Sequence, residues 1–553
     1  MSTFNELIDF TRSTTGTYLD SVVYGDELVT NGDFSNGGAN WSVTNTDATH
    51  YVVFENNSAR FVTGTTTPVT GLLSDVVLEA NETYKLEVNI SSITSGSIKI
   101  DGSNVSQIFD SVGTTVAIVK PVIGNGVIKF YRATDNVDLV IDSVSVKKVI
   151  GGQVSGTPLL RTAAINEPRL EYDASGNPLG LLIEEARTNL LKYSEGFTTG
   201  WGTFNIVTTP NIIASPDGAV SGARLQEDSS GTGGPRRFPN DTAVLTANQA
   251  QTLSCFFKAG TSAYAYLTIR YSNGNVAAVE FDLTSGTVNS TAVFGNMTLN
   301  SSDITSAGNG WYRCSVTATS SASTANGRYF LAMTDGSGLE STGYPNYALT
   351  GKNIYAWGAQ AETGSFPTSY IPTSGSAVTR TKDLASLPVE RFAYNQPQGT
   401  VVAFQETFGT AGNLVPWEIH TANTNRILYN AKSSIATIIT GGSVQASLNH
   451  ADQLPSVFYK QGLAFKKDDI ASSLDASTLT DTSGTIPTVS SFKIGTDRLL
   501  VAMLNGHIKQ IQYYPKRLSN EELELLTQPS ASPTMNLTFD GQATSTLVEG
   551  LHD

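Results

Sequence analysis

The chain has 553 residues, of which 15% are charged, and its formal net charge is −15 at pH 7. Single cores stop growing beyond roughly 250–300 residues, so this length predicts several domains. Nucleic-acid binding depends on Lys and Arg that neutralise phosphates, and the acidic balance therefore argues against a nucleic-acid partner. No run approaches the roughly 18 apolar residues of a membrane span, so membrane insertion is not expected.

The N-terminus and the cysteines limit where the chain folds. Its first ten residues lack the basic start and apolar run of a secretory signal, so we expect folding in a cytoplasm or export as part of an assembly. Cys255 and Cys314 are the only cysteines, too few for a disulfide framework or a Cys-based zinc site. Both lie in strand-like runs of one domain and could face each other. Two reduced core thiols are the favoured interpretation.

The first β-rich region covers residues 22–150. It opens with Glu27-Leu-Val-Thr-Asn-Gly-Asp-Phe34, places Trp41 seven residues later, and closes on the strand 137–148. Within residues 84–92 the apolar side chains alternate, as a half-buried strand requires. An apolar start, a buried Phe–Trp pair and a closing strand that returns beside the start are typical of a jelly-roll sandwich.

A second region, residues 188–387, begins in the same way. Asn189-Leu-Leu-Lys-Tyr-Ser-Glu-Gly-Phe197 is followed by Trp201 after four residues, and the closing strand is 353–362. This similarity predicts a second jelly roll of the same kind. The module-defining tryptophans are expected in the cores; they are Trp41, Trp201, Trp311 and Trp357.

The third β region, residues 388–527, closes on residues 504–514, where Ile508 and Ile511 indicate a bulge. Ser519-Asn-Glu-Glu522 is a capping box and predicts one short helix. A C-terminal arm, 528–553, carries a strand-like segment at 535–539 that either pairs with a neighbouring subunit or folds back on its own domain. The predicted fold class is all-β: tandem antiparallel β-sandwiches (jelly rolls) with one short C-terminal helix.

Several motifs resemble those of bacteriophage and prophage structural proteins. The segment Phe10-Thr-Arg-Ser-Thr-Thr-Gly-Thr-Tyr18 is similar to their opening strand, and Thr162–Asp173 and Gly180–Leu191 resemble its continuation. Gly310-Trp-Tyr-Arg313 and the run 358–380 match the same group. The first two blocks are nearly contiguous in that group but lie about 140 residues apart here, so we infer a domain inserted at a surface turn near Ser21.

The resemblance also assigns the remaining regions. Residues 22–150 and 188–387 look like jelly-roll carbohydrate-binding modules, and residues 388–527 resemble concanavalin A-like or laminin G-like lectin domains. Residues 1–21 are then an N-terminal anchor strand segment, and residues 151–187 a connecting segment that continues the N-terminal motif.

The sequence offers no catalytic motif. The five histidines, at positions 50, 420, 450, 507 and 552, show no metal-ligand spacing, and each is expected at a surface or interface. No Gly-x-Ser-x-Gly elbow and no phosphate-binding Gly-x-x-x-x-Gly-Lys loop occurs, and no spacing singles out a carboxylate pair. These patterns predict a protein that is not an enzyme.

Sugar binding needs an aromatic ring for stacking, with polar groups beside it. In the strand 263–271, Tyr264, Tyr266 and Arg270 share one parity and would form a glycan-binding face if the aliphatic parity is core. Alternatively, a loop or a neighbouring subunit covers that face. Trp417, in a strand of the third region, is a further candidate that could equally belong to the core.

The carbohydrate-binding modules that the chain resembles often hold a structural calcium between their first and last strands. The corresponding last-strand carboxylate is Asp142, with Glu27 or Asn31 as further ligands. The second module has Gln360 at the matching position, which puts its own site in doubt. Calcium needs six to eight oxygen ligands, which one carboxylate does not supply.

The resemblance favours a phage fibre or tail-associated protein on the virion surface, assembled in the host cytoplasm. Its partners would be other virion proteins, further copies of itself in a homo-oligomer (a trimer by family habit), and host cell-surface glycans. The alternatives are a non-enzymatic head decoration, collar or baseplate protein that serves assembly or stability, and a glycan-cleaving tailspike.

Overall fold

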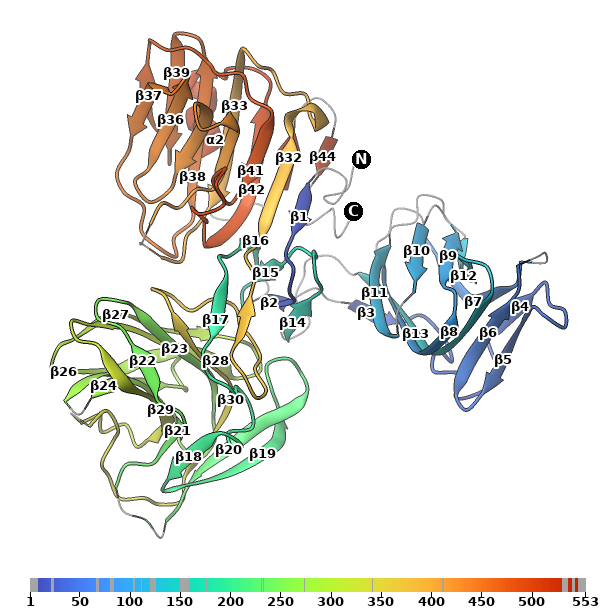
Figure 1. The fold of residues 1–553 in the computed structure, drawn as a ribbon, viewed down its shortest axis with the longest axis horizontal. Coiled ribbons are helices and arrows are strands. Elements are labelled where there is room, and N and C mark those ends of the chain that lie inside the picture. Colours follow the sequence, from blue (N-terminus) through green and yellow to red (C-terminus); the bar gives the residue numbers. More distant parts are fainter. Residues whose placement is uncertain are drawn as a thin grey trace. The chain divides into compact units, whose positions relative to one another are not determined.

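The computed structural model describes the chain in segments, and these segments are almost entirely β-structure (Figure 1). The described residues are 8–20, 24–65, 69–79, 84–102, 105–110, 112–119, 126–149, 159–175, 177–229, 231, 233–272, 274–340, 342–409, 412–529, 536–539 and 543–545. The chain divides into two compact units: Met1–Ser21 with Gly156–Ser545, and Val22–Ser155 with Thr546–Asp553. No helix in the described part is long and apolar enough to cross a membrane.

Residues 22–155 contain two antiparallel sheets, which we call the inserted sandwich. Leu86, Val88 and Ile90 are buried in its core, as the alternation predicted. One sheet has the order β10-β9-β12-β7-β4 and the other β11-β8-β13-β6-β5, with β3 also paired to β13. The strands are β3 (Tyr24–Glu27), β4 (Trp41–Thr44), β5 (Tyr51–Glu55), β6 (Ser58–Thr63), β7 (Gly71–Leu78), β8 (Tyr84–Ser95), β9 (Ile98–Gly102), β10 (Val105–Phe109), β11 (Gly113–Val119), β12 (Gly126–Arg132) and β13 (Val137–Val149).

A second pair of sheets, between Arg187 and Arg380, forms the central sandwich. Its sheets have the orders β18-β21-β29-β24-β25-β26, with β22 also on β29, and β19-β20-β30-β23-β28-β27. The strands are β18 (Trp201–Phe204), β19 (Ile206–Ala214), β20 (Val220–Glu227), β21 (Arg236–Pro239), β22 (Ala243–Leu245), β23 (Gln251–Ala259), β24 (Tyr264–Ser272), β25 (Asn275–Asp282), β26 (Thr287–Phe294), β27 (Met297–Ser306), β28 (Trp311–Ser320), β29 (Thr324–Thr334) and β30 (Asn353–Thr363).

The inserted and central sandwiches begin with the same local structure. Phe34 and Phe197 both adopt left-handed backbone conformations, with φ of 52° and 51°. The ring of Phe34 lies 5.2 Å from that of Trp41, and the ring of Phe197 lies 5.0 Å from that of Trp201. Each indole N–H donates to a backbone carbonyl earlier in the segment. The Phe–Trp pairs are therefore core elements, as the sequence predicted.

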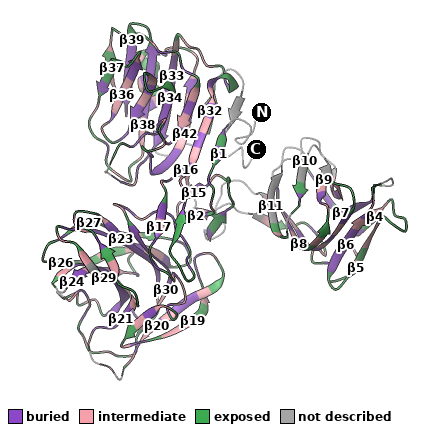
Figure 2. Cartoon of the chain, in the orientation of Figure 1, coloured by how far each residue is buried: buried purple, intermediate pink, exposed green. Residues whose placement is uncertain are grey.

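The C-terminal sandwich is assembled from distant parts of the chain. Its sheets have the orders β1-β32-β41-β34-β35-β36-β37 and β15-β16-β42-β33-β38-β39-β40, the second extended by β43 and β44. The strands are β1 (Asp9–Thr11), β15 (Leu170–Tyr172), β16 (Pro178–Ile183), β32 (Leu384–Pro388), β33 (Gln398–Gln405), β34 (Trp417–Ala422), β35 (Asn425–Asn430), β36 (Ile435–Thr440), β37 (Ser443–Asn449), β38 (Tyr459–Lys466), β39 (Asp469–Leu474), β40 (Ser477–Asp481), β41 (Ser491–Ile494), β42 (Gly506–Tyr514), β43 (Asn536–Phe539) and β44 (Ala543–Ser545). The N-terminal and connecting segments thus contribute strands to this sandwich, and β33 is buried along most of its length (Figure 2).

The structure confirms the bulge and the short helix that the sequence predicted near the end of the chain. The pairing of β33 with β42 shifts between Ile508 and Gln510, which is the expected bulge, and Ile508 and Ile511 are both buried. A capping box on Ser519 starts α2 (Asn520–Thr527), the only α-helix of the described residues; a 3₁₀ turn, η1, covers Val389–Arg391. Strand β43 pairs with β42 in parallel, so the described part of the arm folds back on its own domain.

Two antiparallel ribbons pair the strands that precede and follow the inserted and central sandwiches in sequence. Strand β2 (Gly16–Asp20) pairs with β14 (Leu159–Ala163), and residues 21–158 lie between them in sequence. Strand β17 (Arg187–Asn189) pairs with β31 (Val378–Arg380) on either side of the central sandwich. In both cases the strand before the domain pairs with the strand after it, so the two ends of the domain are adjacent. This geometry tolerates domain insertion.

A buried ionic network joins these segments. Asp383 accepts hydrogen bonds from Arg12 (3.0 Å), from Arg169 and from the backbone N–H of Glu184 (2.9 Å). Glu184 in turn lies 2.8 Å from Arg169 and 3.3 Å from Arg380. All five side chains are at most 1% exposed. Burial alone would raise the pKa of Glu184, but Arg380 and Arg169 outweigh it and lower that pKa, so the carboxylate stays charged.

A buried histidine makes a second link. His507 lies between two carboxylates, with Nδ1 2.7 Å from Glu406 and Nε2 2.8 Å from Glu171. Burial lowers its pKa, but the two hydrogen bonds and charges outweigh burial and raise it to about 9. The surface or interface expectation is therefore wrong for His507, and also for His50, since they are 2% and 1% exposed. His552 lies outside the described residues.

Both cysteines lie in the core of the central sandwich. Cys255 on β23 and Cys314 on β28 are direct cross-strand partners, so they do face each other. Both are free and fully buried, and burial raises the pKa of each thiol.

Replacing Asp383 should destabilise the protein strongly. Asp383→Asn leaves three buried guanidinium groups with one carboxylate, and breaking a buried ion pair costs about 3–5 kcal/mol. Urea unfolding followed by tryptophan fluorescence should show this loss. The matched control is Asp9→Asn, because Asp9 pairs with Arg391 at the surface and is 53% exposed; exposed pairs contribute about 1 kcal/mol or less. Equal effects of the two variants would contradict the assignment.

The charge on His507 should make stability depend on alkaline pH. Its contribution is complete below the unfolded pKa near 6.5 and is lost as pH rises through about 9. The free energy of unfolding should therefore fall across this window, and fall less in His507→Gln. His450→Gln is the control, because burial lowers the pKa of His450. The same pH dependence in wild type and His507→Gln would refute the proposed role.

The thiols should be inert in the folded protein, because reaction requires an accessible thiolate. We expect no reaction of Cys255 or Cys314 with a chromogenic disulfide reagent under native conditions, and full reaction of both in 6 M guanidinium. Rapid native labelling would show that one strand of the pair opens.

Candidate functional site

The sequence-predicted glycan-binding face lies on the sheet that contains β24. Side chains alternate along this strand, so Ala265, Leu267 and Ile269 point into the sandwich core, whereas Tyr266, Thr268 and Arg270 lie on the opposite face. Cross-strand pairing adds other residues to that face. Thr268 is opposite Phe330 and Arg270 is opposite Arg328 on β29, and Phe204 on β18 is opposite Arg236 on β21.

Part of this face is covered by the segment 335–350. The Thr268 hydroxyl donates to the carbonyl of Gly343, and Leu339 packs on Val276 and Ala278. The hydroxyl of Tyr266 donates to Pro235 (2.8 Å), and its side chain is fully buried. The prediction of an exposed Tyr266 is therefore wrong, and the alternative of a face covered by a loop is confirmed for this part.

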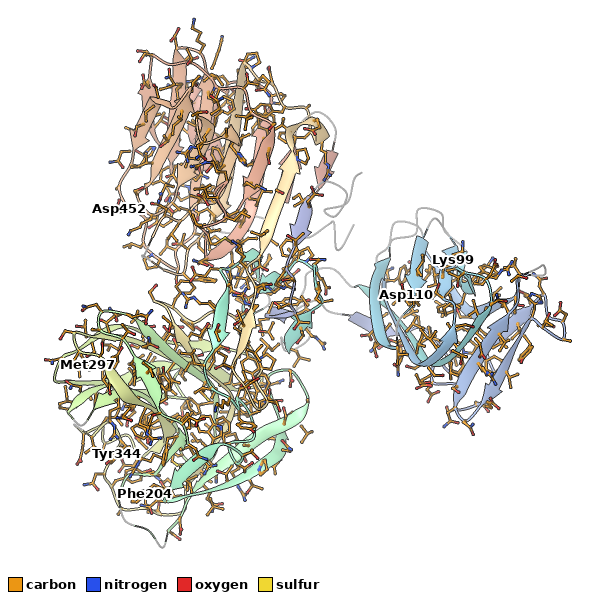
Figure 3. The ribbon with its side chains drawn as sticks, in the orientation of Figure 1. Lys99, Asp110, Phe204, Met297, Tyr344 and Asp452 are labelled. Carbon is orange, nitrogen blue, oxygen red and sulfur yellow. The ribbon has the colours of Figure 1, made fainter. Side chains whose placement is uncertain are left out.

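An arginine stacked between two aromatic rings lies beside the covered part. The guanidinium of Arg236 is 3.9 Å from the ring centroid of Phe204 and 4.1 Å from that of Tyr344. Figure 3 shows Phe204 and Tyr344 close together on the central sandwich. Phe204 is 41% exposed, and Arg236 and Tyr344 are partly exposed. Solvent-exposed aromatic surface is thus available here.

Further arginines and rings continue the stack. Arg270 lies 4.9 Å from the ring centroid of Phe330, and Arg328 lies 5.8 Å from that of Phe238. The ring of Phe330 makes edge-on contacts with those of Phe238 (5.9 Å) and Tyr344 (6.0 Å). Each cation–π contact stabilises the arrangement by about 0.5–1 kcal/mol at an exposed site. The arginine–aromatic surface comprises Phe204, Arg236, Phe238, Arg270, Arg328, Phe330 and Tyr344.

The electrostatics of this surface are dominated by its arginines. Burial, together with the neighbouring charges of Arg328 and Arg236, lowers the pKa of Arg270. Two of these arginines are oriented by backbone carbonyls, since Arg236 donates to Gly234 (2.9 Å) and Arg328 donates to Pro239 and Asn240 (both 3.1 Å).

The other predicted residues are dispersed. Tyr264 is partly exposed at the edge of the covered region, beside Gly336. Trp417 is fully buried in the C-terminal sandwich, edge-on to Phe492, and so belongs to the core. Tyr264, Tyr266 and Arg270 thus share one face of β24, whereas Trp417 lies in another sandwich. Sequence reasoning missed Phe204, Arg236 and Tyr344, although the run Arg236-Arg237-Phe238 was a visible basic and aromatic signal.

The residues proposed for calcium make hydrogen bonds within the inserted sandwich. Asp142 accepts a hydrogen bond from Ser91 (2.7 Å), and Glu27 accepts from Val29, Ser145 and Val146. The carbonyl oxygen of the Asn31 side chain accepts from the backbone of Asn36. Among the described residues no group of three or more His, Cys, Asp or Glu could hold a metal ion. Calcium also takes carbonyl and water oxygens, so the site at Asp142 stays a prediction.

Comparison with known proteins gives only distant likenesses. No family model and no curated protein matches the chain. The structure is similar to the N-terminal CBM22-1-CBM22-2 tandem domain of Paenibacillus barcinonensis Xyn10C, at 10% identity and a TM-score of 0.19, covering 62% of this chain and 100% of that one. It is also similar to domains LG4-5 of the mouse laminin alpha1 chain, at 10% identity and a TM-score of 0.17, covering 49% and 83%.

Trypanosoma rangeli sialidase is a third such structure, at 11% identity and a TM-score of 0.20, covering 93% of this chain and 98% of that one. Because the structures matched include those of an enzyme, the prediction that the chain is not an enzyme is corrected and withdrawn. At these TM-scores no activity of this chain follows from any of the three.

Proposed function

We propose that this chain is a bacteriophage fibre or tail-associated protein that binds glycans of the host cell surface through the arginine–aromatic surface. The observation that carries the proposal is the exposed stack of Phe204, Arg236 and Tyr344 on the outer face of the central sandwich. Phe204 and Arg236 lie on paired strands, and Tyr344 is in edge-on contact with Phe330, so the stack is held in place before a ligand arrives.

The chemistry of this stack suits a sugar. Aromatic rings bury the C–H face of a pyranose, and adjacent polar groups satisfy its hydroxyls. The rings of Phe204 and Tyr344 supply the apolar contact, and the guanidinium of Arg236 supplies donors beside them. A single surface of this kind binds weakly, so attachment would depend on several copies in a homo-oligomer, for which we propose a trimer.

The phage assignment rests on the sequence motifs. Arg12, Arg169 and Arg380 all lie in segments that resemble phage structural proteins. These arginines form the buried network that joins the N-terminal segment to the C-terminal sandwich. The proposed location is the virion surface, after assembly with other virion proteins in the host cytoplasm.

Removing the two rings should abolish glycan recognition. In the purified, assembled protein, Phe204→Ala combined with Tyr344→Ala should lower affinity for array-identified glycans at least tenfold, because the stacking surface is lost. Tyr312→Ala is the control, since Tyr312 is a partly exposed tyrosine of the other sheet. Blank arrays and no binding to host cells would refute the proposed function, as would binding that survives the double substitution.

A further inference from the structure

Positive charge gathers on the arginine–aromatic surface of an otherwise acidic chain. The chain carries a net charge of −15, yet Arg236, Arg270 and Arg328 cluster on one sheet face. Within the described residues, no carboxylate lies within 4.0 Å of any of the three. Three arginines elsewhere do have a carboxylate partner: Arg60 pairs with Asp138 (2.9 Å), Arg391 with Asp9 (2.8 Å) and Arg517 with Asp469 (2.9 Å).

The three arginines repel one another in the folded protein. Burial lowers the pKa of Arg270, Tyr344 raises it, and the charges of Arg328 and Arg236 lower it further. Collecting like charges without a counter-ion costs free energy, and this cost is recovered when an anion binds among them. A surface that served only to pack the covering segment would not need three cations.

The donor geometry is also suited to a planar anion. Backbone carbonyls hold Arg236 and Arg328 through one terminal nitrogen each, and each guanidinium carries five N–H donors. Arg270 donates no hydrogen bond within the described part of the chain, and its side chain is partly exposed. A planar fork of this kind binds a carboxylate through two parallel hydrogen bonds.

We propose that the arginine–aromatic surface is specific for acidic saccharides, binding a sugar carboxylate with Arg236, Arg270 and Arg328 while the sugar ring contacts the exposed parts of Phe204 and Tyr344. This inference rests on the proposed function and names its ligand class: glycans that contain uronic or other carboxylated sugars. A nucleic acid is a poorer fit because the rest of the chain is strongly acidic and would repel a polyphosphate.

Matched acidic and neutral probes test the inference. The assembled full-length protein is titrated with a galacturonate tetrasaccharide and its carboxyl-reduced counterpart, with sialyllactose and lactose, and with a sulfated galactose tetrasaccharide. We expect at least tenfold tighter binding of one carboxylated probe than of its neutral partner, and a preference that weakens as salt rises. Arg236→Gln and Arg270→Gln should each remove most of this preference. Arg270→Lys should restore only part of it, because lysine keeps the charge but lacks the fork.

Two controls separate the possible outcomes. Arg60→Gln, in the inserted sandwich, should leave binding unchanged, and near-ultraviolet circular dichroism should show that each variant is folded. Equal affinity for acidic and neutral probes that is lost in the Phe204 and Tyr344 double variant would overturn the charge specificity but leave the proposed function intact. Tighter binding of the sulfated probe than of any carboxylated one would also overturn it. Failure to bind any glycan would remove both the inference and the proposed function.

Discussion

The rest of the structure depends on the buried network of Arg12, Arg169, Arg380, Glu184 and Asp383. Its members come from chain segments up to 371 residues apart, since Arg12 bonds Asp383 directly. Charged groups this deeply buried are tolerated only when each has a partner of opposite charge. A fold that lacks one of these segments would leave a buried charge unpaired and would therefore be destabilised. Hydrophobic packing alone tolerates such substitutions more readily. The network therefore fixes which strands complete the C-terminal sandwich.

Paired strands on either side of each domain explain how one chain carries two further sandwiches. Strands β2 and β14, which flank the inserted sandwich in sequence, pair with each other, and β17 and β31 do the same on either side of the central sandwich. Each pair of strands holds the first and last residues of its domain close together. The domain between them can therefore change without displacing the strands that flank it. The repeated Phe–Trp structure at Phe34 and Phe197 shows that the two domains also start in the same way.

The segment 335–350 has two roles at the arginine–aromatic surface. Segment 335–350 covers part of the outer sheet face through Leu339 and Gly343, and contributes the ring of Tyr344 to the stack on Arg236. One segment therefore closes the core and completes the exposed stack. In the buried network carboxylates neutralise the arginines, whereas on this surface the arginines remain without a carboxylate partner in the described chain. This contrast is the basis of the binding role proposed for Arg236, Arg270 and Arg328.

The sequence by itself determined the all-β class, the alternation of β8, the Phe–Trp pairs, the bulge before Ile511 and the capping box at Ser519. Each of these depends on neighbouring residues, through side-chain periodicity, turn conformation or helix capping. The tertiary structure decided which distant segments meet. It placed β1 and β16 in the C-terminal sandwich, buried His507 between Glu171 and Glu406, and brought Phe204, Arg236 and Tyr344 together. Strand parity assigns a residue to a face, but it cannot show whether a segment 70 residues away covers that face, because such contacts depend on the energy of the whole fold.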